Sequence, residues 1–235
     1  MDVRFHNSPK ETSRMNTEEL RGNFLCRSLM QDDAIRYIYT HYDRVIIGGV
    51  KPVNKEVTLE THTELKAEYF LERREIGIIN VSGKGSVQAD GEVFELDKLS
   101  CLYLGKGVKN VSFRSADPKT PAHFFLLSTP AHQAYPSRRM TKEEASPVDL
   151  GSPATSNERT IYKYIHLDGI QSCQLVMGLT VLKNGSVWNS VPPHTHTRRM
   201  EVYFYFDVPE DQRIFHFMGQ PQETRNVIMA NHEAI

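Results

Sequence analysis

The chain has 235 residues, a formal net charge of −1 and 39% hydrophobic residues, a composition typical of a globular protein with one large or two smaller domains. The balanced charge argues against a nucleic-acid binder with a broad basic surface, and the absence of a long apolar run argues against a membrane-spanning helix. The N-terminus lacks an apolar signal segment, so we expect a cytoplasmic protein with neither nucleic acid nor membrane as a partner.

Residues 1–30 are expected to form a lead-in segment that packs against the domain that follows it. Asn16-Thr-Glu-Glu19 is typical of a helix start, with Asn16 as the cap and Glu19 reaching back to it. The helix would carry an apolar stripe made of Leu20, Phe24 and Leu25.

Residues 31–130 have the pattern of a β domain. Asp90-Gly91, between two apolar runs, is a strong hairpin signal. Short strands separated by glycine-containing turns indicate an antiparallel sandwich or barrel. The clearest runs of β-branched and aromatic residues are 37–47, 75–81, 100–104 and 123–127.

Residues 131–160 are richer in proline, serine and glycine, which predicts a linker with one helical turn at Thr141-Lys-Glu-Glu144. The β pattern resumes over residues 161–235, which we interpret as a second β unit. The predicted fold class is therefore all-β and antiparallel, built from two units.

The three cysteines, Cys26, Cys101 and Cys173, are far apart and form no Cys-x-x-Cys unit, so they predict no disulfide framework. Cys101 and Cys173 lie in apolar runs, which favours buried thiols. Nothing in the local sequence favours a catalytic cysteine.

The stretch from Val191 to Glu201, read Val-Pro-Pro-His-Thr-His-Thr-Arg-Arg-Met-Glu, predicts a metal site. His194 and His196 are two residues apart, and on an extended strand such side chains face the same way. Glu201 begins an alternating apolar run and would bring a carboxylate to the same point. Two imidazoles and a carboxylate suit zinc, iron, manganese or nickel, although the same pattern also arises by chance on solvent-facing strands.

The two β regions look like copies of each other. Glu72-Arg-Arg-Glu75 and its apolar run can be laid on Arg198-Arg-Met-Glu201 and its run. The earlier copy lacks the paired histidines, so we expect the first unit to be metal-free. Fewer residues follow the glutamate in the second copy, which predicts a second barrel that is incomplete at its C-terminal end and carries an unpaired edge.

This double β unit, with Gly185, His194-Thr-His196 and Glu201, resembles the two-unit (bicupin) form of the cupin superfamily, in which each unit is a β-barrel or jelly roll. More closely, the chain resembles the 5-keto-4-deoxyuronate isomerase family over essentially its whole length. The residues that carry this resemblance are 1–4, 69–75, 103–107, 130–132, 173–175, 194–206 and 218–225, of which the last two stretches are long and specific.

The resemblance implies one zinc per subunit, held by two histidines, a glutamate and a third histidine. The first three fall on His194, His196 and Glu201, and the fourth is expected beyond Ile235. The later histidines, His216 and His232, do not lie where the family places its ligand. The loss of one ligand in four is expected to weaken zinc binding and activity.

The resemblance also implies a ketol-isomerase that converts 5-dehydro-4-deoxy-D-glucuronate, a keto sugar acid, to 3-deoxy-D-glycero-2,5-hexodiulosonate during breakdown of pectin and other polyuronates. The reaction moves a proton between adjacent carbons and needs a general base, and the sequence leaves this catalytic residue unknown. The family further implies a homo-oligomer, commonly a hexamer.

Three residues are candidates for substrate contact. Strand parity places Tyr205, together with Tyr203, on the face of Glu201. A substrate carboxylate calls for an arginine, and Arg199 and Arg225 lie near the metal motif in the sequence. The same residues serve equally well as core aromatics or surface ion pairs.

Two other functions stay open at this point. A cupin dioxygenase would use the same ligands to hold iron. A non-catalytic, cupin-like sugar-binding or assembly protein, lacking the final ligand, would bind a uronate or oligomerise without turnover.

Overall fold

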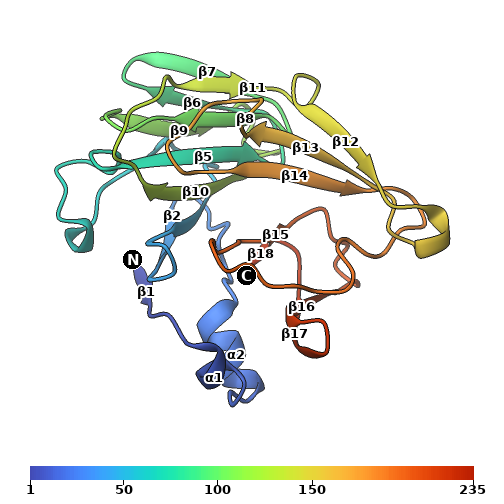
Figure 1. Cartoon of the computed structure of the whole chain (residues 1–235). Coiled ribbons are helices and arrows are strands. Elements are labelled where there is room, and N and C mark those ends of the chain that lie inside the picture. The colour runs from blue at the N-terminus through green and yellow to red at the C-terminus, as the bar shows by residue number, and fades with distance from the viewer.

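The computed structural model describes residues 1–235, and most of its regular structure is β-strand, as predicted (Figure 1). No helix in it is long and apolar enough to span a membrane. The helical elements are α1 (Pro9–Thr12), α2 (Thr17–Phe24) and two single 3₁₀ turns, Thr63–Leu65 and Pro153–Thr155.

The first β unit consists of two facing sheets. The larger has seven strands in the order β1 (Asp2–Arg4), β2 (Ile35–Thr40), β3 (Ile46–Val50), β10 (Phe124–Pro130), β5 (Arg74–Asn80), β8 (Cys101–Leu104) and β11 (Arg138–Met140). The smaller has four, in the order β4 (Val57–Thr58), β9 (Val111–Ser115), β6 (Gly85–Ala89) and β7 (Glu92–Leu96). The predicted hairpin at Asp90-Gly91 joins β6 to β7, and both residues have the positive φ that a tight two-residue turn requires.

Alternation along β5 explains how the larger sheet is buried on both faces. Ile76 and Ile78 point between the two sheets, into a core of 19 buried residues. Ile79 points the other way, into a second core of 19 residues shared with the rest of the chain. All seven residues of β5 are therefore buried, and this strand lies at the centre of the molecule.

The second half of the chain forms smaller sheets. A three-stranded sheet contains β12 (Ser146–Leu150), β13 (Arg159–Ile165) and β14 (Met177–Leu182). Two further pairs follow: β15 (Phe204–Tyr205) with β18 (Glu233–Ala234), and β16 (Ile214–Gln220) with β17 (Glu223–Met229). Side chains of β13 and β14, including Tyr164 and Met177, pack on the outward face of the seven-stranded sheet.

The stretch 131–160 is more ordered than the predicted linker. Within it, β11 pairs with β8 of the first unit, and β12 pairs with β13 of the second. β12 lies at a sheet edge, where Pro147 costs no ladder hydrogen bond, so its proline and serine content concealed a strand. The predicted helical turn is present, since the amide of Ala145 donates to the carbonyl of Thr141.

The N-terminal helix forms as predicted and packs on both halves of the chain. Asn16 and Glu19 form a reciprocal capping box at the start of α2. Phe24 of this helix lies against Tyr42 of the first unit, and Leu20 is buried against Val227 and Met229 of β17, near the other end of the chain. The capping signal is local, whereas the docking partner is set by contacts some 200 residues away, which the sequence did not indicate.

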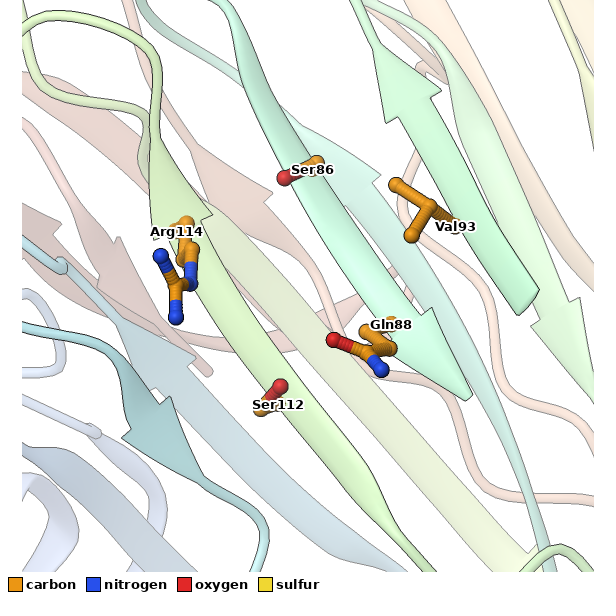
Figure 2. A pocket seen from close by; sticks show the side chains of 5 residues that line it. All are labelled: Ser86, Gln88, Val93, Ser112 and Arg114. Atoms are coloured by element: carbon orange, nitrogen blue, oxygen red, sulfur yellow. The ribbon is translucent and has the colours of Figure 1, made fainter. Parts of the chain in front are cut away.

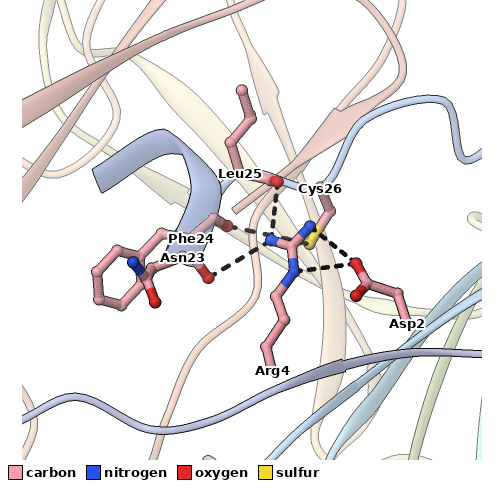
Figure 3. Close-up of polar contacts among 6 residues, drawn as sticks. All are labelled: Asp2, Arg4, Asn23, Phe24, Leu25 and Cys26. Atoms are coloured by element: carbon pink, nitrogen blue, oxygen red, sulfur yellow. Dashed lines mark hydrogen bonds and ion pairs between the residues drawn. The ribbon is translucent and has the colours of Figure 1, made fainter. Parts of the chain in front are cut away.

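Arg4 ties β1 to the end of α2 (Figure 3). Its guanidinium donates to the carbonyl oxygen of Leu25 at 2.8 Å and to the carboxylate of Asp2 at 3.3 Å. Since β1 also pairs in parallel with β2, residues 1–26 are attached to the first unit through β1 and to β17 through α2.

Two histidines meet where the first unit contacts the C-terminal segment. The rings of His123 and His232 lie edge to face with centroids 4.9 Å apart, and Nδ1 of His123 is buried without a hydrogen-bond partner. Burial, followed by the neighbouring His232 and Lys51, lowers the pKa of His123 to about 4, with Asp32 opposing. Burial also lowers the pKa of His232. Both rings are therefore neutral at pH 7.

This pair predicts acid sensitivity. Because the folded pKa of His123 lies below the ordinary value of 6.5, the unfolded chain binds the proton more tightly. Stability attributable to His123 is complete above about pH 6.5 and falls as the pH drops towards 4. The full shift corresponds to about 3 kcal/mol, and solvent screening of this half-buried ring reduces the expected loss to about 2 kcal/mol. Urea unfolding across this range should show a shallower pH dependence in His123→Gln than in the wild type; equal slopes would contradict the assignment.

Candidate active site

The predicted metal motif lies in an irregular segment. Residues 191–203 form no regular strand, and only the short β15 remains of the alternating strand expected from Glu201 onwards. The alternation of side chains nevertheless holds. Val202 and Phe204 pack on the core shared with the first unit, where the Phe204 ring stacks on that of Phe125 with centroids 4.4 Å apart.

The opposite face of this segment collects the predicted site residues around Glu201. Its Oε1 accepts a hydrogen bond from Arg199 at 2.9 Å and lies 3.2 Å from Nε2 of His196. Its Oε2 accepts one from the hydroxyl of Tyr203 at 3.1 Å. The rings of His194 and His196 are nearly perpendicular, with centroids 5.0 Å apart. The predicted ligands are therefore neighbours in space, although they do not lie on one strand.

Behind Glu201, Tyr205 pairs with a histidine from β16. The Tyr205 hydroxyl lies 2.8 Å from Nδ1 of His216, and the His216 ring is 5.2 Å from that of Tyr203. Burial lowers the pKa of His216, so this histidine is neutral. Burial, assisted by Glu201, raises the pKa of Tyr203 to about 12, and burial also raises the pKa of Tyr205.

His216 is a site residue that the sequence pattern did not indicate. It does not lie where the family places its fourth ligand, and alternation in Phe215-His216-Phe217 would by itself turn the two phenylalanines inwards. In the structure both phenylalanines are exposed and the histidine faces inwards.

The two candidate arginines lie in different surroundings. Arg199 lies at the site, where the same terminal nitrogen that contacts Glu201 is 3.4 Å from Nε2 of His196. Arg225, on β17, donates to the carbonyl oxygens of Thr12 at 3.1 Å and Met15 at 2.6 Å. Its guanidinium thus holds the N-terminal segment.

The proposed match between Glu75 and Glu201 has a geometric difference. Glu75 shares a face of β5 with Gly77, where an added Cβ would meet Met177, so this carboxylate points out of the first unit towards the second. Glu201 points away from the first unit, beside Tyr203. The two glutamates are equivalent in the sequence pattern but differ in their partners: Glu75 accepts from a loop of the other half of the chain, whereas Glu201 contacts residues of its own segment.

The side chains of His194, His196 and Glu201 are of the kinds that bind a divalent ion, but they are not positioned around a common point. No group of three or more His, Cys, Asp or Glu side chains in the structure is set out to hold a metal ion. His196 and Glu201 are close enough to share an ion, with His194 beside them, and imidazole nitrogens with a carboxylate are suitable zinc ligands. The positive charge that contacts both His196 and Glu201 here is the guanidinium of Arg199.

A shallow depression lies far from these residues, on the outward face of the smaller sheet of the first unit (Figure 2). It is lined by Ser86, Gln88, Val93, Ser112 and Arg114. The Arg114 guanidinium is already paired with Glu56, so the depression presents no unpaired charge to a sugar acid.

Known proteins resemble the chain over its full length. A 4-deoxy-L-threo-5-hexosulose-uronate ketol-isomerase of Shouchella clausii is 50% identical over 235 residues, covering 100% of this chain and 85% of the relative. The protein of the same name in Formosa agariphila is 51% identical over 234 residues, covering 100% and 84%. That of Escherichia coli O139:H28 is 47% identical over 237 residues, covering 100% and 85%.

Solved structures show the same fold at lower identity. An IolB-like protein from Salmonella typhimurium superposes with a TM-score of 0.67 at 15% identity, covering 91% of this chain and 83% of the other. The KduI/IolB family matches residues 24–233. Given this match and relatives at about half identity, the chain belongs to the KduI/IolB family, as the resemblance in its sequence predicted.

Proposed function

We propose that the chain is a metal-dependent ketol-isomerase that converts 5-dehydro-4-deoxy-D-glucuronate to 3-deoxy-D-glycero-2,5-hexodiulosonate. The observation that carries the proposal is the gathering of His194, His196 and Glu201 on one face of the segment leading into β15. Support comes from relatives at about 50% identity that carry the name of this ketol-isomerase. We further propose zinc as the ion and polyuronate breakdown, including that of pectin, as the setting.

His194, His196 and Glu201 would hold the ion, which when bound polarises the carbonyl and hydroxyl oxygens of a substrate. The Tyr203 hydroxyl, by donating to Oε2 of Glu201, fixes the orientation of that carboxylate. Arg199 is the cation placed to bind the substrate's carboxylate, since it already lies at the site. We keep Arg225 as a third substrate-contact candidate, although its guanidinium contacts the N-terminal segment.

Tyr205 and His216 supply proton-transfer groups beside these ligands. The Tyr205 hydroxyl and His216 Nδ1 share a hydrogen bond of 2.8 Å, and both groups are neutral. A neutral imidazole can accept a proton at pH 7. Its tyrosine partner can donate a hydrogen bond to a substrate oxygen. We therefore propose this pair as the chain's candidate for moving the proton between adjacent carbons.

We further propose the bicupin arrangement for the two halves of the chain. The two later histidines have other partners in the structure: His216 shares a hydrogen bond with Tyr205 through Nδ1, and His232 lies against the ring of His123 in the contact with the first unit.

The test is metal content measured together with turnover. Purified protein is expected to contain one zinc per chain by elemental analysis and to isomerise the keto-deoxyuronate. A chelator should abolish turnover, and zinc should restore it. Turnover that survives complete metal removal would contradict metal dependence. Uronate binding without turnover in the zinc-loaded protein would favour the non-catalytic alternative, and oxygen uptake with iron would favour the dioxygenase.

We also propose that the chain forms a homo-oligomer, commonly a hexamer in the family it resembles. The outward face of the β16–β17 hairpin supports self-association because it is apolar and uncovered. Phe215 is 58% exposed, and Ile228, its partner across the hairpin, is 44% exposed. Light scattering should give a mass several times that of one chain, and Phe215→Asp should lower it; a monomeric wild type would contradict the proposal.

A further inference from the structure

Four of the sequence motifs that mark the family resemblance meet in one cluster outside the candidate active site. Each contributes one residue: Glu75, Tyr103, His132 and Cys173. They come together on the outward face of the first unit, where the loop preceding β14 crosses β5 and β8. The proposed isomerase chemistry uses none of them.

Cys173 and His132 form a nucleophile–base pair in this cluster. The Cys173 Sγ lies 3.4 Å from Nδ1 of His132 and 3.7 Å from Nε2. The His132 side chain is exposed and Cys173 is half-buried, so a small molecule can reach the sulfur. An imidazole within hydrogen-bond reach of a thiol is the arrangement that stabilises a thiolate.

The backbone that carries this thiol is held rigidly. Glu75 is fully buried, and its carboxylate accepts the amides of Cys173, Gln174 and Leu175, each at 2.7 Å. The hydroxyl of Tyr103 donates to the same carboxylate at 2.6 Å. The thiol therefore projects from the segment through which the second half of the chain is tied to the first unit.

The other two thiols differ from Cys173. Cys26 and Cys101 are buried, and burial raises the pKa of Cys26 to about 11 and that of Cys101 as well. Neither lies beside a histidine base. The expectation that Cys173 would be a buried thiol was wrong, because its apolar run begins only after it, at Leu175.

We propose that Cys173 is a reactive thiol, paired with His132, that is modified by low-molecular-weight disulfides. His132 takes up the thiol proton, and the sulfur attacks one sulfur of the reagent. A new disulfide bond forms as the reagent's own breaks, and the other sulfur leaves as a thiolate. The adduct sits on the loop bound by Glu75, so modification loosens the contact between the two halves of the chain. This goes beyond the proposed function.

The test uses the aromatic disulfide 5,5′-dithiobis(2-nitrobenzoate) on the folded protein. One thiol per chain should react rapidly, and all three should react in guanidinium. The rapid phase should be absent in Cys173→Ser and about tenfold slower at pH 7 in His132→Gln, because the base is removed. His6→Gln, at an exposed position between β1 and α1, is the matched control and should react at the wild-type rate.

Near-ultraviolet circular dichroism checks that each variant is folded, and melting of the modified protein provides a second measurement. The adduct should lower the Tm by about 2–4 °C. If the rapid reaction with the disulfide reagent persists in Cys173→Ser, or if His132→Gln reacts at the wild-type rate, Cys173 and His132 are not a reactive pair. An unchanged Tm in the fully modified protein would overturn its effect on the contact.

Discussion

Replacing Glu75 with alanine is expected to lower the free energy of unfolding by about 3–5 kcal/mol, because it removes one acceptor shared by several buried donors. The Glu75 side chain is fully buried. Its carboxylate accepts from the hydroxyls of Tyr103 and Thr129, in addition to the three loop amides. Each buried donor left unpaired costs about 1–3 kcal/mol, with relaxation and water entry recovering part of the sum.

Guanidinium unfolding of the variant measures this loss. Glu75→Gln keeps the volume and one acceptor oxygen, but its amide nitrogen faces some of the amides and hydroxyls that donate to Glu75. Its free energy of unfolding should therefore fall by an intermediate amount. Glu92→Ala, at an exposed position of β7, is the control and should change stability by less than about 0.5 kcal/mol. A loss below about 1 kcal/mol in Glu75→Ala would show that the loop is held by other contacts.

Replacing Glu201 with glutamine is expected to reduce isomerase turnover by about 100-fold or more and to weaken zinc retention, while leaving the fold intact. The substitution removes the only carboxylate of the proposed ligand set. It also replaces the anionic partner of Arg199 by a neutral amide, since that guanidinium donates to Oε1 of Glu201 at 2.9 Å. Neutralising this charge should therefore weaken both zinc binding and the ion pair with Arg199.

Turnover and zinc content are measured on the same preparation. Glu210→Gln, an exposed carboxylate on the loop after β15, is the matched control and should retain both. Because Glu201 is partly exposed, thermal melting of Glu201→Gln should be close to that of the wild type. Full activity with full zinc content in this variant would remove Glu201 from the ligand set and, with it, the site as proposed.

Features that depend on near neighbours were predictable from the sequence. The capping box at Asn16 and the hairpin at Asp90-Gly91 formed as expected. The shared face of Glu201 and Tyr203 followed from alternation, even where no regular strand was present, since the apolar Val202 between them packs on the core on the other face.

Features that depend on distant partners were not predictable. Nothing in the local pattern assigns Arg225 to carbonyl oxygens of residues 12 and 15, or brings His216 to Tyr205. The orientation of Glu75 was also hidden, because the residues flanking it are compatible with either strand parity and only the loop at Cys173 decides between them. Tertiary hydrogen bonds selected the outcome in each case.

The attachment of residues 1–26 has a consequence for how the protein is made. The backbone of Cys26 exchanges hydrogen bonds with that of Ala234, and Leu20 is buried by Val227 and Met229. A ribosome releases α2 long before β17 exists, so the earliest helix must stay undocked until nearly the whole chain has been translated. Its apolar stripe is exposed during that interval, which makes the nascent N-terminus the segment on which a chaperone would act first.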